Sequence, residues 1–521
     1  MLNNQSFDDR LPPTEQLLIM GGDARIALDP FSGLNKYGCQ QFPDPDLLAF
    51  GSSTASVIST TGFAAANRLR HKLLRDIATE SHTTVYAREI QRVRSEFLRS
   101  CELSDLTDLE AVFAASGTDA HLIATQYAGS GESMPALVVM VEANETGRGV
   151  VAALSGRHPD TVVGSKNNAV IEGLRIAGSS AFEVVPVPIR LADGAPRLLA
   201  DVDAQVESLV NEAVALGRRV LLILVDQSKT GLIAPSPACV SMLHHRLPDS
   251  VDVLVDACQF RIAPPTLRTY LQQGFMVALT GSKFVTGPSF SAVLLLPFAA
   301  AQQLRQRKFP QALFLYSSRA NWPASWDTAD VLDSETNFGL LLRWEAALEE
   351  MQRFREIPQA AIINFLQIFA QVIRHRLAND PAFEPLPVLQ LDRRPLIEAS
   401  SWDHLQTIFS FLLYRPETDT GRIPLCREET LIVYKQLQVG LAENSPFNRT
   451  NPSGGIASLR CQFGQPVACG SRNGIEVSAL RICVSARLII EAASQDGKGA
   501  AVVIEGALAA LSKAAWIAGN L

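Results

Sequence analysis

The chain has 521 residues, of which 47% are hydrophobic and 19% charged, so it can bury a large core and is expected to form two or three structural units. Its net charge of −7 gives no electrostatic reason to expect a nucleic acid or an anionic membrane as partner. The eight cysteines form no CxxC pair, which is typical of reduced thiols in a cytoplasmic protein.

The first 48 residues are rich in proline and glycine, among them Pro12, Pro13 and Gly21. We expect this segment to run irregularly against the small domain and the active site. The polar start of the chain lacks the pattern of a secretory signal, which again favours the cytoplasm. A helical pattern begins near Thr61 and continues towards Leu98.

Short apolar runs then alternate with helical stretches, such as the amphipathic segment 199–216. The runs that we interpret as strands are residues 109–115, 136–142, 181–187, 220–225, 254–255, 276–279 and 292–296. Strands that alternate with helices predict a mostly parallel α/β sheet with helices on its faces.

The pattern changes after residue 298. An irregular stretch, 298–336, leads into helical patterns at 338–353 and 358–377, and short strands near 407–413 and 480–484 indicate a smaller α+β unit. The apolar tail 499–521 contains Glu505 and Lys513, which favours a packed helix over a membrane span. The expected units are therefore an N-terminal segment (1–48), a large domain (49–335) and a small C-terminal domain (336–521).

Lys283 lies in a loop of small residues, 278–288, and follows Asp256 by 27 residues. A lysine amine can form a Schiff base with the aldehyde of pyridoxal phosphate, and a carboxylate can keep the pyridine nitrogen protonated. Each residue also has an ordinary interpretation. Lys283 taken alone is typical of a solvated loop, and Asp256 of a helix cap or a salt bridge.

Residues suited to bind phosphate occur at compatible positions. Ser116, Gly117 and Thr118 stand where a strand is expected to give way to a helix, and the glycine lets the backbone approach a ligand closely. The alternative for this segment is an ordinary helix-capping turn. Thr280 and Ser282 supply further hydroxyls beside the lysine.

Seven segments in order resemble the class V pyridoxal-phosphate enzymes, which have fold type I and include the cysteine desulfurases. They are residues 51–56, 116–120, 227–231, 256–259, 280–288, 334–337 and 480–483. The most specific are Asp-Ala-Cys-Gln at 256–259, similar to D-x-x-Q, and the lysine loop, similar to S-x-H-K-x-x-G-P. The resemblance implies a large domain with a mostly parallel seven-stranded sheet between helices, and a smaller α+β domain.

For the cofactor, pyridoxal 5'-phosphate, the resemblance implies a Schiff base with Lys283, pairing of Asp256 with the pyridine nitrogen and contact of Gln259 with the ring oxygen. The remaining cofactor-binding residues that it implies are Ser116, Gly117, Thr118, Thr280 and Ser282 at the phosphate, Ser228, and Thr336 from a partner subunit. No metal is expected.

For the substrate, an amino acid, the resemblance implies that Arg481 binds the carboxylate and that Gln227 contacts the ring or the substrate. The alternative for Arg481 is a structural ion pair. The resemblance also implies a homodimer that shares its active sites across the interface.

This sequence departs from the family pattern at several positions. Ser282 replaces the histidine that usually precedes the lysine, and segment 142–147 offers no histidine or aromatic residue to stack on the ring. His121 is a weak stacking candidate. Cys426 is the one loop cysteine available to a desulfurase, but it lacks flexible glycine-rich surroundings.

The expected reaction proceeds through an external aldimine and a quinonoid of the amino-acid substrate. The divergence and the long stretch 298–336 favour a lyase or a β- or γ-replacement enzyme of specialised biosynthesis, with S-adenosylmethionine as one candidate substrate. The alternatives are a class V aminotransferase, desulfurase-like sulfur transfer, and a catalytically silent α/β binding protein.

Overall fold

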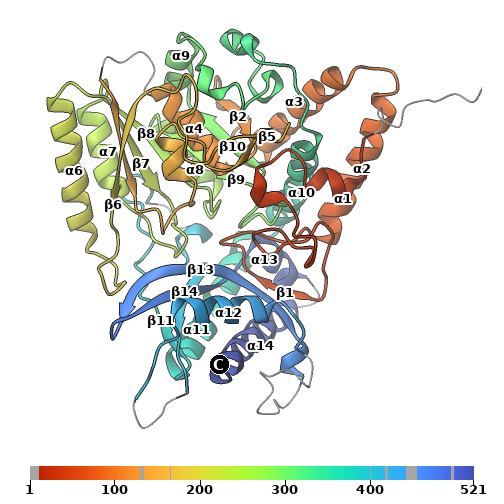
Figure 1. Cartoon of the computed structure of the whole chain (residues 1–521), viewed down its shortest axis with the longest axis vertical. Helices are drawn as coiled ribbons and strands as arrows, with labels where there is room; N and C mark the ends of the chain where they lie inside the picture. Colours follow the sequence, from red (N-terminus) through yellow and green to blue (C-terminus); the bar gives the residue numbers. More distant parts are fainter. Residues whose placement is uncertain are drawn as a thin grey trace, which may run out of the picture.

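The computed structural model describes residues 11–128, 134–164, 166–398, 401–416, 421–441, 455–494 and 498–521. The large sheet and its helices occupy the upper part of Figure 1, and the smaller sheet with its helices lies below. The carboxyl ends of the large sheet's parallel strands carry the loops that matter for function.

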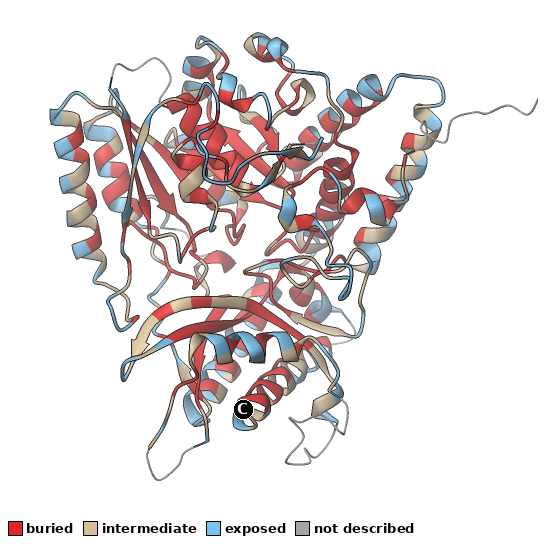
Figure 2. Ribbon diagram, viewed as in Figure 1, coloured by how far each residue is buried: buried red, intermediate tan, exposed pale blue. Residues whose placement is uncertain are grey.

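The large sheet has seven strands in the order β2-β10-β9-β8-β7-β3-β6. Their bounds are β2 (Glu110–Ala114), β3 (Ala136–Val141), β6 (Phe182–Val187), β7 (Val220–Val225), β8 (Val251–Asp256), β9 (Met276–Thr280) and β10 (Ala292–Leu296). All neighbours pair in parallel except β10, which is antiparallel to both β2 and β9. The seven predicted strands are thus confirmed, and Figure 2 shows how deeply most of them are buried.

Helices share the hydrophobic core of the large sheet, to which each contributes an apolar stripe. These helices are α2 (Thr60–Asp76), α3 (His82–Ser100), α4 (Gly117–Ala128), α6 (Leu199–Ala215), α7 (Pro237–Arg246), α8 (Pro264–Gln272) and α10 (Phe338–Arg355). The single helical pattern expected from Thr61 to Leu98 is in fact two helices, since Ser81 caps α3. The stretch expected to be irregular, 298–336, includes α9 (Phe298–Arg305) and three short 3-10 helices.

The smaller sheet has the order β1-β13-β14-β12-β11. Its strands are β1 (Leu47–Phe50), β11 (Phe383–Pro385), β12 (Ile408–Leu413), β13 (Arg460–Arg472) and β14 (Ile475–Cys483). The helices of this unit are α11 (Gln359–Asn379), α12 (Arg427–Leu437), α13 (Ala486–Ala493) and α14 (Gly499–Gly519). Because β1 pairs with β13, the chain enters the smaller sheet before it builds the larger one.

Among the described residues, the two largest hydrophobic cores change over between α10 and α11, and the domain boundary at residue 335 stays a prediction. Helix α10 packs on α2 and α3, and its buried residues belong to the core of the large sheet. The second core consists mainly of residues between Ile362 and Ala518. It also includes Phe50 of β1, Ala263 and Phe284. The N-terminal helix α1 (Thr14–Leu18) packs on α10 and α2.

Helix α14 is the one described helix that is long and apolar enough to cross a membrane, and the bent pair α10–α11 meets the same test only if taken together. In this structure the buried face of α14 packs into the second core, as predicted for the C-terminal tail. Lys513 on this helix donates to the main-chain oxygens of Leu437 and Val439 at 3.2 and 2.7 Å.

A buried ion pair joins the end of β7 to the segment that leads into the smaller sheet. Arg393 donates from Nε and Nη2 to the two carboxylate oxygens of Asp226, both at 2.7 Å, and Tyr270 donates to the same carboxylate at 2.7 Å. Both charged side chains are almost fully buried. Such a pair is costly to break from one side, because the remaining charge stays buried without a partner.

We expect Arg393→Met to lower the free energy of unfolding by about 3–5 kcal/mol, since it leaves the Asp226 carboxylate without its cation. The denaturant midpoint, followed by circular dichroism, measures the change. Arg394→Met is the matched control, because Arg394 is exposed and its one ion pair among the described residues is with Asp392 at the surface. Equal midpoints for the two variants would contradict a structural role of the buried pair.

Candidate active site

A cavity of about 540 Å³ lies at the carboxyl ends of the parallel strands, where α/β sheets bind their ligands. The loops after β2, β3, β7, β8 and β9 line it. Residues of β13 and β14 in the smaller sheet and Arg25, Lys36 and Tyr37 of the N-terminal segment complete the wall.

The structure brings together eleven of the twelve site residues predicted from the sequence. Those that line the cavity are Ser116, Gly117, Thr118, Gln227, Ser228, Asp256, Gln259, Thr280, Ser282, Lys283 and Arg481. Thr336 does not line it and precedes Asn337, which caps α10. A contribution of Thr336 to a partner's site stays a prediction.

The start of α4 is built to receive an anion. The Ser116 hydroxyl accepts from the Asp119 N–H at 3.2 Å, and the Asp119 carboxylate accepts from the Ser116 N–H at 3.0 Å. A Cβ at Gly117 would lie 2.7 Å from the sulfur of Cys258, so only glycine fits this position. The segment is therefore a capping turn, and the helix N-terminus that it forms also opens onto the cavity.

Asp256 ends β8 and is held by three groups. His121 Nε2 lies 3.3 Å from its carboxylate, and the Cys258 N–H donates to it at 3.1 Å. Burial alone would raise the pKa of Asp256, but the His121 ring and the Lys283 amine hold it well below its usual value. For the His121 ring, burial alone would lower the pKa, but the neighbouring Asp256 carboxylate raises it above its usual value. Asp256 is thus a fixed, ionised carboxylate.

His121 therefore has a different place from the weak stacking role considered above. Its Nδ1 lies 2.7 Å from the Gly117 carbonyl oxygen, and its other ring nitrogen faces Asp256. The ring thereby links the helix N-terminus to the acid.

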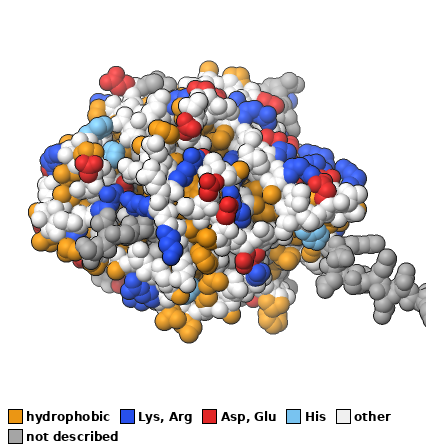
Figure 3. Space-filling model, turned by 90° about the horizontal axis from the view of Figure 1, so that it is seen from above, with side chains coloured by type: hydrophobic (Ala, Val, Ile, Leu, Met, Phe, Trp, Pro, Cys, Tyr) orange, Lys and Arg blue, Asp and Glu red, His pale blue; other side chains and the backbone are white. Residues whose placement is uncertain are grey.

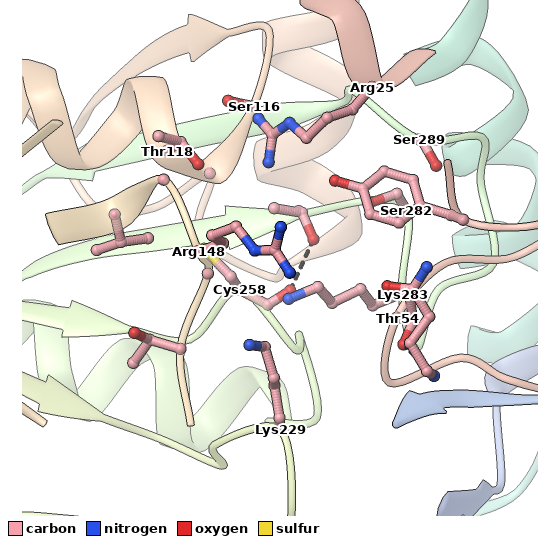
Figure 4. Close-up of a pocket in the computed structure, with 18 of the residues that line it drawn as sticks. Arg25, Thr54, Ser116, Thr118, Arg148, Lys229, Cys258, Ser282, Lys283 and Ser289 are labelled. Atoms are coloured by element: carbon pink, nitrogen blue, oxygen red, sulfur yellow. Dashed lines mark hydrogen bonds between the residues drawn. The ribbon is translucent and has the colours of Figure 1, made fainter. Parts of the chain in front are cut away.

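Lys283 projects into the cavity from a tightly packed loop (Figure 4). Gly287 donates to the Gly281 carbonyl oxygen at 2.8 Å, and a Cβ at Gly287 would lie 2.7 Å from that of Ala347. Phe284, the residue after Lys283, stacks on Trp402 with ring centres 4.9 Å apart. Burial lowers the pKa of the Lys283 amine, against the opposing effect of Cys258 and Asp256, which increases the share of neutral, nucleophilic amine.

Arg481 is a buried cation whose partners are neutral. It donates to the Lys229 carbonyl oxygen and the Thr54 hydroxyl, both at 3.0 Å, and to the Gln465 carbonyl oxygen. Within the described ranges it has no ion pair with a carboxylate, and its Nε has no hydrogen-bond partner. The structural ion pair considered above is therefore absent from this part of the chain, and a ligand carboxylate would suit the site.

Three further predicted residues of the wall, Gln259, Gln227 and Ser228, are partly engaged by the protein itself. Gln259 donates to the Ser53 carbonyl oxygen at 3.0 Å, and Gln227 donates to that of Arg261 at 3.1 Å. The side-chain oxygen of Gln227 is buried without a partner. The Ser228 hydroxyl donates to the Glu145 carboxylate at 2.7 Å, so in this structure its proton is used within the protein.

The sequence analysis assigned no role to several charged residues that line the cavity. Arg25, Arg148 and Lys229 line it and are labelled in Figure 4. Glu145 also lines it and pairs with Arg190 at 2.6 Å. The available signal was position alone, because Glu145 and Arg148 follow β3 directly and Lys229 lies in a recognised turn.

Among the described residues, one trio has the spacing of a metal site. Ligand atoms of His121, Asp256 and Cys258 all lie within 4.8 Å of one another. Burial raises the pKa of the Cys258 thiol well above its usual value, and Asp256 adds to the effect. Asp256 in this trio is already engaged by His121 and by the Cys258 N–H.

Asp119 gives a prediction for pH. Burial, with the nearby Asp23, raises its pKa to about 7, although Arg25 and Ser116 act in the opposite direction. The folded state thus holds this proton more tightly than the unfolded chain, whose pKa is about 4. The resulting stability is complete below about pH 4 and is lost as the pH rises to about 7.

We expect Asp119→Asn to remove this loss. The free energy of unfolding of the variant, relative to the unchanged protein, should therefore rise between pH 4 and pH 7 by up to about 4 kcal/mol. Denaturant unfolding of both proteins at pH 5 and pH 8 measures the difference. A constant offset between the two would show that Asp119 titrates normally.

No protein-family model matches the chain, and no curated protein matches it either. Among solved structures it is similar to the cysteine desulfurase CsdA from Escherichia coli, with 12% identity, 90% of this chain and 95% of that chain covered, and a TM-score of 0.47.

The cystine C-S lyase C-DES, solved with its product cysteine persulfide, has 14% identity and a TM-score of 0.51 over 89% of this chain and 98% of that chain. TDC from Oryza sativa, solved with PLP and tryptamine, has 13% identity and a TM-score of 0.50 over 91% and 83%. The chain shares the fold of the last two, and the predicted fold-type-I architecture is confirmed.

Proposed function

We propose that this chain is a pyridoxal-phosphate-dependent enzyme that acts on an amino acid. One observation carries the proposal: a buried, ionised Asp256 and the amine of Lys283 share one cavity with the N-terminus of α4. The presence of PLP in the TDC structure agrees with it. Both charged groups argue against a catalytically silent binding protein, because burying them there is costly without a ligand to use them.

The residues present fit this cofactor. The N-terminus of α4, with Ser116, Thr118 and the close approach at Gly117, suits the phosphate. Asp256 suits a protonated ring nitrogen, and Lys283 suits the aldehyde. When bound, the cofactor supplies an electron sink for the bonds at the substrate α-carbon.

The chain's own residues then orient and protonate the substrate. Arg481 binds its carboxylate, because the guanidinium is fixed by three neutral acceptors and has no counter-ion among the described residues. Lys283 takes and returns protons at the α-carbon, since burial lowers its pKa and so increases the share of neutral amine that can accept a proton. The smaller sheet covers the cavity and limits the access of water.

We favour a lyase or a replacement reaction over sulfur transfer. All eight cysteines lie in the described residues, and Cys258 alone lines the cavity. Its raised pKa makes it a poor nucleophile, and Cys426 is engaged as the N-cap of α12. Transamination stays the second candidate. S-adenosylmethionine is a less suitable substrate, because its sulfonium would face the cations of the cavity.

We further propose a homodimer in the cytoplasm without nucleic-acid or membrane partners. Fold-type-I sites are completed across a two-fold interface according to the resemblance, and the eight free thiols agree with a reducing compartment. Figure 3 shows basic side chains interspersed with acidic and uncharged ones over the face in view.

Titration of the purified protein with pyridoxal phosphate tests the function. A near-visible absorption band should appear, and borohydride reduction followed by peptide mass spectrometry should place the adduct on Lys283. Addition of amino acids, with detection of keto acid, then separates transamination from elimination or replacement. A protein that stays colourless would refute the proposal.

A further inference from the structure

The proposed function leaves several cations of the cavity wall without a task, among them Lys229 and Arg148. Arg481 is assigned to the substrate carboxylate and Lys283 to the cofactor, whereas Lys229 and Arg148 serve neither. Figure 4 shows the ends of Lys229, Arg148 and Lys283 directed into the same part of the cavity. Lys229 also interacts electrostatically with Arg148, Arg481 and Lys283.

Lys229 is held in place but is not neutralised. Its main chain is fixed from both sides, since its N–H donates to the Glu145 carbonyl oxygen at 2.9 Å and its carbonyl oxygen accepts from Arg481 at 3.0 Å. Its Nζ donates to the carbonyl oxygen of Asn144 at 3.1 Å, which leaves ammonium protons for a ligand.

The acids of the cavity wall form no ion pair with these two cations among the described residues, although Glu145 partly offsets the charge of Lys229. Glu145 is engaged by Arg190, Ser228 and Thr230, and Asp256 by His121. Asp160 lies 3.8 Å from Arg25, and Glu172 is exposed to solvent. In the part of the chain that the structure describes, neither Lys229 nor Arg148 forms an ion pair.

A positive charge on Lys229 is unfavourable at this position of the cavity. Burial, together with Arg481 and Lys283, lowers the pKa of Lys229 to about 7. Arg148 is exposed at the cavity and follows β3 in the loop that closes over Thr118. A ligand anion between the two side chains would offset the repulsion and restore the charged form of Lys229.

We propose that Lys229 and Arg148 bind a second anionic group of the substrate, so that the enzyme selects amino acids with an acidic side chain. The inference rests on the proposed function and names its substrate class. The α-carboxylate would lie at Arg481, and the side-chain carboxylate, sulfonate or phosphate would lie between Lys229 and Arg148. Neutral amino acids would leave both cations without a partner.

The unchanged protein, loaded with pyridoxal phosphate, gives the first test. We expect aspartate, glutamate, cysteate or O-phosphoserine to bind roughly 10- to 100-fold more tightly than asparagine, glutamine or serine. The spectral shift on titration and isothermal calorimetry both measure the dissociation constants, and the best acidic ligand identifies the anion. Equal affinities for acidic and neutral amino acids would overturn the inference.

Variants at position 229 give the second test. Lys229→Met should lower the ratio of acidic to neutral affinity about tenfold, while Lys229→Arg should keep most of it. Neutral amino acids and the absorption band of the cofactor report that the variant is folded and loaded. If Lys229→Met weakens acidic and neutral ligands by the same factor, the residue has only a structural role.

Arg148→Met separates the two possible duties of that residue. A fall in the same ratio supports side-chain recognition, whereas weaker cofactor binding at an unchanged ratio would assign Arg148 to the phosphate and overturn its part of the inference. A protein that binds no pyridoxal phosphate would refute the proposed function instead. Calorimetry without cofactor would then still report whether acidic amino acids are preferred.

Discussion

Replacement of Lys283 by alanine should abolish the near-visible band that pyridoxal phosphate gives with the protein. The band requires a Schiff base, and alanine has no amine to form one. Turnover should fall by about 100- to 10,000-fold, because in the proposed function Lys283 also exchanges protons at the substrate α-carbon. Absorption spectra and steady-state rates of the two purified proteins measure both effects.

The chain provides a matched control for this experiment. Lys229 lines the same cavity, and burial lowers the pKa of both amines. If buried amines in general captured the aldehyde, Lys229→Ala would lose the band as well. We expect Lys229→Ala to keep it, because Lys283 interacts with the acid Asp256 and Lys229 with the acid Glu145. If Lys229→Ala lost the band and Lys283→Ala kept it, Lys229 would be the residue that forms the Schiff base.

The large domain was predictable because its strands are continuous apolar runs. Strands such as β7 and β9 are buried on both faces, so their sequences contain no polar interruption. The smaller sheet was harder to predict. The longest of its strands, β13, contains Gly464, Pro466 and Gly470, and its pairing with β14 shifts register twice, so no alternating pattern survives.

The candidate site was predictable for residues that lie at the carboxyl ends of neighbouring strands. Asp256 and Lys283 follow neighbouring strands, and parallel strands bring their carboxyl ends to the same edge. The pair of His121 and Asp256 was not predictable, because it depends on how α4 packs over the sheet. Lys229 and Arg148 were missed for the same reason, since nothing local distinguishes them from solvated loop cations.

Replacement of Asp256 by asparagine should have the second largest effect. Asparagine keeps the shape but removes the charge that, in the proposed function, holds the pyridine nitrogen protonated. Breaking a buried charge pair from one side costs about 3–5 kcal/mol, which corresponds to a loss of about 100- to 10,000-fold in turnover or cofactor affinity. The pKa of Asp256 lies well below its usual value, so the unchanged enzyme should not lose this carboxylate as the pH falls to about 5.

The fold loss of turnover or cofactor affinity caused by Asp256→Asn should therefore stay the same from about pH 5 to pH 8. This constancy is a sharper test than the size of the loss. Asp252→Asn is the control, because Asp252 starts the same strand but pairs with Arg219 outside the cavity. Rates and cofactor dissociation constants for both variants at several pH values measure the outcome. If the defect of Asp256→Asn vanished near pH 5, the carboxylate would already be protonated there in the unchanged enzyme. The ion pair with the cofactor would then not be what Asp256 contributes.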